Sequence, residues 1–232
     1  MHYRLSACVR LSGWPIGLIF AGLSLLFVFR PGIGLAQTAK TLNLDTEPIP
    51  KNYQSWSLFL ICNPQWLLAE NEANLNNLYT HFNSFGDAIG DRHLAVWFTR
   101  RPPTPNGSIA KDLDVNRNAA LCTKLKLLPS KSPYVVVMTS YPDVKAENLK
   151  YEVLITLNNL PPDDIGNLLT KLTDQLLVQG LRQADFDSAQ YWGAWRRSVE
   201  SIADGLASMI KKVTITVNAG PVKLEVEGGT GP

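Results

Sequence analysis

The sequence predicts an α/β fold, a β-α-β-α-β-β-α core followed by an amphipathic helix and a β-hairpin. Three observations carry this prediction. Short apolar runs bounded by turn residues alternate with stretches in which apolar residues recur at helical spacing. The last two apolar runs of the core follow each other with only a polar loop between them, and the chain ends in two segments of strict apolar–polar alternation. With 232 residues, 45% of them hydrophobic, the chain has enough material for one core and an appendage.

The first 36 residues predict a secretory signal peptide. Two arginines precede an uncharged apolar stretch at 11–29, and Gly34-Leu35-Ala36 supplies small residues for cleavage. That stretch of 19 residues is also close to the ~20 that span a bilayer, so an uncleaved anchor with a cytoplasmic N-terminus stays open as the alternative. In both cases residues 37–232 are expected outside the cytoplasm, in the periplasm or secreted.

Charge and composition exclude several classes of site. Residues 1–36 hold three of the 22 cations and none of the 20 anions, so the exported part is close to neutral and offers no footprint for nucleic acid. The glycines do not cluster into a phosphate-binding loop. Beyond the signal segment only His81 and His93 remain, without the spacing of a metal site. We therefore expect no cofactor and no metal.

Residues 37–54 are polar and contain two prolines, and we expect a tether to a domain over 55–180. Ser55 to Ile61 is a nearly continuous apolar run, typical of a strand buried on both faces. Apolar residues at helical spacing from Leu75 predict a helix that stops at Gly86 or Gly90. A second buried strand is predicted over 93–99, and a polar loop follows it.

Asp114 can cap a helix that continues to Leu125. A turn ending in Ser132-Pro133 then leads to a third strand over 134–138. Two right-handed crossovers would make the first three strands parallel.

A fourth strand over 151–157 is close in sequence to the third, which predicts an antiparallel pair at the edge of the sheet. Pro161-Pro162-Asp163-Asp164 then opens a helix that reaches Leu176. Proline suits the first turn of a helix, and acids are stabilised by the positive end of the helix dipole.

Residues 181–232 predict an extension with a long helix over about 187–211 and a hairpin of strands over 213–217 and 222–226. The apolar face of the helix has two interpretations. It either packs back on the sheet or, with the hairpin, forms a surface over 187–226 for a partner or for a second copy of the chain. The candidate partner-binding residues on this face are Trp192, Trp195, Val199, Ile202 and Leu206.

The core resembles the thioredoxin fold over 55–180. Cys62-Asn63-Pro64-Gln65 follows the first strand, Ser132-Pro133 precedes the third strand, and the last helix closes the sheet in the expected place. The resemblance implies that Cys62 takes the place of the first cysteine of the family's Cys-x-Pro-Cys motif. It also implies a cis Pro133 that faces the motif. The second cysteine of the motif is Gln65 in this chain.

The cysteines allow three interpretations. Cys8 lies in the signal segment, and exported thiols tend to oxidise, so Cys62 and Cys122 suggest a disulfide. A structural bridge closing a loop of ~60 residues would stabilise the fold by roughly 4 kcal/mol. Alternatively, Cys62 is a redox thiol at a helix N-terminus, with Cys122 as the resolving thiol and Pro133 docking the partner. The third interpretation is two unpaired, buried thiols.

The expected function is that of an exported, non-catalytic thioredoxin-like module that binds or scaffolds a protein partner in the cell envelope. The alternative is a thiol–disulfide oxidoreductase or redox chaperone that uses Cys62 with Cys122. The missing second cysteine of the motif favours the first and argues against an enzyme. Membrane contact is expected only through residues 11–29, if they are not cleaved.

Overall fold

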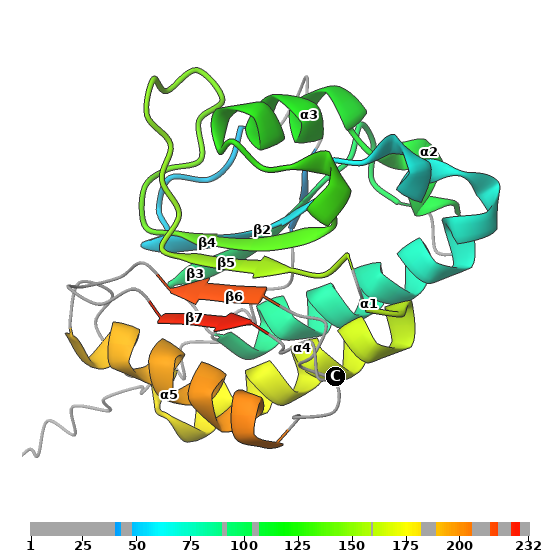
Figure 1. The fold of residues 1–232 in the computed structure, drawn as a ribbon. Coiled ribbons are helices and arrows are strands. Elements are labelled where there is room, and N and C mark those ends of the chain that lie inside the picture. The colour runs from blue at the N-terminus through cyan, green and yellow to red at the C-terminus, as the bar shows by residue number, and fades with distance from the viewer. Residues whose placement is uncertain are drawn as a thin grey trace, which may run out of the picture. The chain divides into compact units, whose positions relative to one another are not determined.

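Among the residues that the structure describes, seven strands form one mixed sheet in the order β1-β3-β2-β4-β5-β6-β7 (Figure 1). The computed structural model describes residues 40–42, 48–89, 92–103, 107–158, 160–181, 189–205, 214–217 and 224–227, all within one unit, Gly34–Pro232. The strands are β1 (Lys40–Leu42), β2 (Ser55–Leu60), β3 (His93–Phe98), β4 (Tyr134–Met138), β5 (Val153–Thr156), β6 (Thr214–Val217) and β7 (Leu224–Glu227). The α/β class predicted from the sequence is confirmed.

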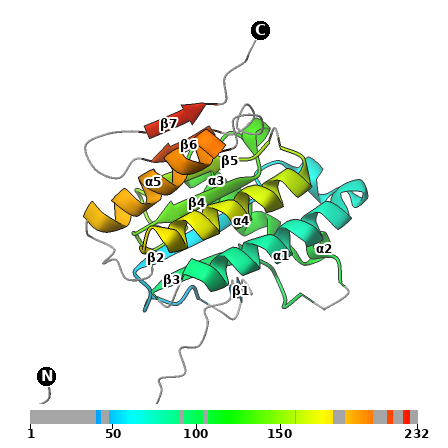
Figure 2. The same ribbon diagram turned by 90° about the horizontal axis from the view of Figure 1, so that it is seen from below.

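Helices cover both faces of this sheet, but unequally. On one face lie α1 (Glu72–Ile89), α4 (Pro162–Val178) and α5 (Ala189–Gly205), whereas α3 (Val115–Lys124) lies over the other (Figures 1 and 2). The connections contain α2 (Ile109–Asp112) and three short 3-10 helices, η1 (Pro64–Leu67), η2 (Ala69–Asn71) and η3 (Pro129–Lys131).

Alternation along the strands divides the core into two clusters. In β2, the side chain of Phe59 packs with α1, α4 and α5 in a larger cluster, and its neighbour Leu58 packs with α3 in a smaller cluster. All six residues of β2 are buried, which confirms the prediction of a strand covered on both faces. The larger cluster also holds Trp97, Val135, Ile155 and Trp195, and the smaller holds Trp56, Phe98, Tyr134 and Val136.

The prediction of three parallel strands is wrong. β2 and β3 are parallel, but β4 is antiparallel to β2, with Leu60 opposite Tyr134. The reason is where α3 lies. Its residue Cys122 is bonded to Cys62 at the carboxyl end of β2, so the chain that leaves α3 enters β4 at that end and runs back. The antiparallel pairing of β4 with β5 is confirmed, although β5 is not an edge because β6 pairs with it.

Part of the expected tether belongs to the sheet. Lys40–Leu42 forms β1, a parallel partner of β3, and Ile49 is buried in the smaller cluster. The hydroxyl of Tyr141 donates a hydrogen bond of 2.8 Å to the carbonyl oxygen of Ile49. Three residues are too few to show a period in the sequence, which is why this strand was not predicted.

The predicted helices of the core are present. The first runs through Gly86 to Ile89, and α3 is capped as expected, because Asp114 Oδ1 accepts a hydrogen bond from the backbone N–H of Arg117. The fourth helix begins at Pro162, with Asp163 and Asp164 in its first turn.

The C-terminal extension packs back on the sheet. α5 buries Trp195, Val199 and Ile202 in the larger cluster, and β6 extends the sheet beyond β5. These three side chains therefore cannot line an exposed partner surface, as one interpretation of the sequence expected. Trp192 is only partly buried against the same cluster, and Leu206 lies outside the described residues.

The predicted signal segment, including the apolar stretch at 11–29, also lies outside the described residues. Within the residues that the structure does describe, no helix has both the length and the apolar character needed to cross a bilayer.

Candidate functional site at the disulfide and the prolyl turn

A disulfide joins the carboxyl end of β2 to α3. Cys62 and Cys122 are bonded, with an S–S distance of 2.04 Å and Cα atoms 5.8 Å apart. Cys122 is 5% exposed, whereas Cys62 is half-buried at the surface of the smaller cluster. The predicted disulfide is therefore present, and the interpretation as two unpaired thiols is wrong.

The prolyl turn lies directly beside Cys62. The backbone N–H of Cys62 donates a hydrogen bond of 2.8 Å to Ser132 Oγ, and the peptide bond between Ser132 and Pro133 is cis. Trp66 Nε1 donates to the carbonyl oxygen of Ser132 at 3.2 Å. The end of β2, η1 and the start of β4 therefore meet at one point, which places Cys62, Cys122 and Pro133 together as the sequence predicted.

Asn118 is a site residue that sequence reasoning missed. It is fully buried, its Oδ1 accepts a hydrogen bond of 3.0 Å from the backbone N–H of Ile61, and its Nδ2 donates to the carbonyl oxygen of Asp114. The amide thus links α3 to the end of β2 one turn before the disulfide. The available signal was the spacing, because Asn118 and Cys122 are four residues apart and share one helix face.

The helix expected to activate Cys62 is not in place. The segment after Cys62 is the four-residue 3-10 helix η1, capped by Asn63 Oδ1, and the long helix α1 begins only at Glu72. A helix dipole lowers a thiol pKa only when the sulfur lies at the first turn of a helix. The disulfide instead lies among the apolar side chains of the smaller cluster.

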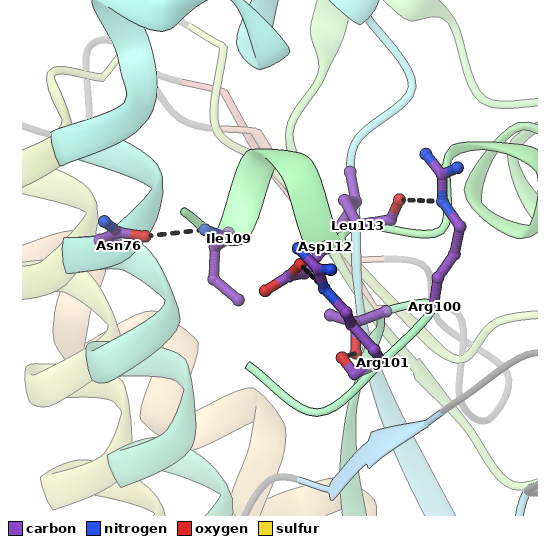
Figure 3. A network of polar contacts seen from close by, with 7 residues as sticks. Asn76, Arg100, Arg101, Ile109, Asp112 and Leu113 are labelled. Atoms are coloured by element: carbon purple, nitrogen blue, oxygen red, sulfur yellow. Dashed lines mark hydrogen bonds and ion pairs between the residues drawn. The ribbon is translucent and has the colours of Figure 1, made fainter. Parts of the chain in front are cut away.

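The end of β3 is closed by a network of polar contacts (Figure 3). Arg101 Nε donates to the buried carboxylate of Asp112, and Arg100 Nε donates to the carbonyl oxygen of Leu113. Asn76 Oδ1 accepts a hydrogen bond from the backbone N–H of Ile109, which ties α2 to α1. The network holds the loop between β3 and α3, and so fixes the start of the helix that carries Cys122.

A second polar network is buried on the side of the sheet that carries the larger cluster. His93 is fully buried, and its two ring nitrogens lie 2.5 Å from Ser55 Oγ and 2.7 Å from Ser57 Oγ. The hydroxyl of Tyr191 lies 3.4 Å from Ser55 Oγ. Burial lowers the pKa of His93 to about 3, so the imidazole is neutral at pH 7. Ser55, Ser57, His93 and Tyr191 are all fully buried, which is typical of a structural polar network.

His81, the other candidate histidine, lies on α1, where its ring approaches Gly166 of α4. Over the described ranges, no three or more histidine, cysteine, aspartate or glutamate side chains are grouped so that they could hold a metal ion. The site with the most chemistry is therefore the disulfide beside the prolyl turn. Compared with known proteins, the chain matches no protein-family model, no curated protein and no solved structure.

Proposed function

We propose that the chain is an exported, non-catalytic thioredoxin-like module that binds a protein partner in the cell envelope. The likeness is supported by the order of the elements from β2 to α4, in which a parallel pair of strands is followed by an antiparallel pair and a closing helix. It is further supported by the position of Cys62 beside Ser132. Export is supported by the signal-like sequence of residues 1–36 and by the disulfide itself.

The observation that carries the non-catalytic assignment is the pairing of Cys62 with a buried cysteine on another element. Gln65 stands where the thioredoxin motif has its second cysteine, and Cys122 is 5% exposed on α3. A resolving thiol must be accessible to attack a mixed disulfide. Since Cys122 lies inside the smaller cluster, the bridge serves to hold α3 on the sheet.

One observation favours the alternative, a thiol–disulfide oxidoreductase. Cys62 is half-buried rather than sealed, so a substrate thiolate could attack its sulfur. That attack would release Cys122 as a thiolate and form a mixed disulfide. A second substrate thiol would then displace Cys62, leaving an oxidised substrate and a reduced protein.

A thiol count with an insulin-reduction assay separates the two functions. For residues 37–232 we expect no free thiol without reductant, slow reduction of the bridge under native conditions, and no turnover of insulin. Cys62→Ser and Cys122→Ser should both lose the stability that the bridge supplies, and Cys122→Ser should lose more, because it places a hydroxyl inside the apolar cluster. Turnover that Cys62→Ser abolishes would overturn the non-catalytic assignment.

The partner surface must lie outside the buried face of α5. Leu68, 50% exposed, follows η1, and Leu128, 56% exposed, precedes η3. Trp66 ties the first of these segments to Ser132, and the hydroxyl of Tyr134 donates to the carbonyl oxygen of Leu128. Both exposed leucines therefore flank the disulfide and the prolyl turn, and we assign the partner contact to this end of the sheet.

Site-specific photocrosslinking in the cell envelope tests this assignment. A photoreactive phenylalanine derivative at Leu128 should give one discrete protein adduct that Leu68→Asp suppresses. The matched control is the same derivative at Val178, which is 76% exposed at the end of α4 and should give no such adduct. Equal adducts from both positions would contradict the assignment.

A further inference from the structure

A cavity of about 530 Å³ lies on the α3 side of the sheet, and neither cysteine of the disulfide lines it. Its volume is in the range of small-molecule sites in proteins. Three separate segments form the walls: the chain before β2, the first turns of α3, and the loop after β4. The lining residues are Pro48, Lys51, Asn116, Arg117, Ala120, Tyr141, Pro142, Asp143, Val144 and Lys145.

The walls are held in place by the protein's own contacts. The hydroxyl of Tyr141 donates to the carbonyl oxygen of Ile49, and Trp56 Nε1 donates to that of Pro50, so the segment before β2 is fixed at two points. The loop after β4 is closed by Asp143 Oδ1, which accepts a hydrogen bond of 2.9 Å from the backbone N–H of Lys145. A ligand would therefore meet a preformed site and would not have to order it.

The lining is electropositive. Lys51, Arg117 and Lys145 come from the three different segments, and Asp143 is the only acid among the lining residues. Lys51 Nζ lies 5.2 Å from the ring centroid of Tyr141, so this ammonium is held over the cavity wall by a cation–π contact. One acid against three cations leaves the lining with a net positive charge.

Arg117 is the central cation. Its guanidinium carbon lies 4.7 Å from the ring centroid of Phe98, and the side chain is half-buried. Within the described part of the chain, no acceptor forms a hydrogen bond or ion pair with the guanidinium, although buried Asp114 acts on it at longer range. Burial lowers the pKa of Arg117, and the negative charges of Asp114 and Asp143 oppose that shift. Arg117 also lines the cavity, between the segment before β2 and the loop after β4.

We propose that this cavity binds a small organic carboxylate, with the carboxylate on Arg117, Lys51 and Lys145. A guanidinium donates two parallel hydrogen bonds to a planar carboxylate, which neither lysine can do. The apolar side chains of Pro48, Ala120, Pro142 and Val144 provide contact for the carbon body of the ligand. This site is independent of the proposed function, because it shares no lining residue with the disulfide or the prolyl turn.

Titration with benzoate, followed by the backbone amide resonances, tests the proposal. We expect saturable shifts confined to residues 48–51, 116–120 and 141–145, with millimolar or tighter affinity. Benzamide, which has the same body without the charge, should cause no comparable shifts. Inorganic phosphate, an anion without an apolar body, should bind more weakly than benzoate, and equal or tighter phosphate binding would overturn the carboxylate assignment.

Three variants locate the binding charge. Arg117→Gln should weaken benzoate binding at least tenfold, to judge from the strength of a bidentate ion pair. Lys51→Gln with Lys145→Gln should weaken it less and flatten its dependence on salt. Lys111→Gln removes the same charge from an exposed position on α2 and should leave the affinity unchanged.

The double lysine variant keeps the test valid if Arg117→Gln does not fold, because both lysines are exposed and neither contributes to a core cluster. Unchanged benzoate affinity in the double lysine variant, or shifts spread over the α1–α4 face, would overturn the proposal.

Discussion

The two faces of the sheet are covered in different ways. Three helices of 17 or 18 residues, α1, α4 and α5, bury the larger cluster. The smaller cluster is covered by α3, a helix of 10 residues, together with coil that includes Ile49 and Tyr141. The Cys62–Cys122 disulfide lies on this second face. The disulfide therefore lies on the face of the sheet that is covered by fewer helical residues.

The two faces also differ in the solution conditions that destabilise them. The larger cluster's face contains the buried His93 network, which a proton can disrupt. The smaller cluster depends on a bond that a reductant can break. From this difference we expect the α3 face to respond to redox conditions and the face covered by three helices to respond to acid.

The largest expected effect comes from removing the disulfide. Replacing both cysteines, Cys62→Ala and Cys122→Ala, releases a loop with a sequence separation of 60 residues. The free energy of unfolding should fall by about 4 kcal/mol, because the unfolded chain regains the entropy of that loop. Urea denaturation measures the loss, and hydrogen exchange should show amides of α3 opening before those of α1 and α4.

Added reductant provides the control for this prediction. It should destabilise the natural protein by a similar amount and leave the double alanine variant unchanged. Equal loss of protection in α1 and α3 would show that the disulfide supports both faces alike, which would contradict the comparison.

The sequence was sufficient for the α/β class and for most elements, because long amphipathic helices and buried strands leave clear periods. It was not sufficient for the direction of β4. The rule for right-handed crossovers applies once two strands are known to be parallel. What decides the direction is the contact of Asn118 and Cys122 with the end of β2, a tertiary contact between residues far apart in the sequence.

The candidate site was predicted in part. Cys62, Cys122 and Pro133 were identified because cysteine and proline impose specific local chemistry wherever they occur. Arg117 was not identified as a binding residue, since one arginine on an exposed-looking helix has no distinctive sequence signal. Three of the candidate partner residues, Trp195, Val199 and Ile202, are buried against the chain's own sheet. The sequence could not show this, because an apolar helix face looks the same whether a partner or the chain's own sheet covers it.

The second prediction concerns acid and His93. Its pKa is about 3 in the folded protein and 6.5 in the unfolded chain, so between these values the unfolded chain binds the proton and the folded protein does not. Stability therefore falls as the pH drops below 6.5, by about 2 kcal/mol at pH 5. Urea denaturation at several pH values measures how steeply the free energy of unfolding depends on pH, and we call this dependence the slope.

A non-titrating replacement isolates the His93 contribution. His93→Gln should remove most of the slope between pH 6.5 and 5, although the variant is less stable overall. His81→Gln, the matched change on α1, should keep the slope of the natural protein. A slope that survives His93→Gln would place the acid sensitivity elsewhere in the molecule.

The smallest effect tests how closely α1 and α4 approach on the face covered by three helices. A Cβ atom on Gly166 would lie 2.5 Å from two ring atoms of His81, so Gly166→Ala forces this half-buried ring to move. The clash opposes the gain of about 1 kcal/mol that alanine brings to a helix, and we expect net destabilisation of about 1 kcal/mol. In a His81→Ala background the same substitution should instead stabilise, which a double-mutant cycle by urea denaturation measures.

The control is Gly193→Ala on α5, where the new Cβ would meet the flexible end of Arg197 at 3.1 Å. That substitution should be neutral or stabilising in both backgrounds, so a change of sign confined to Gly166 assigns the effect to the contact between α1 and α4.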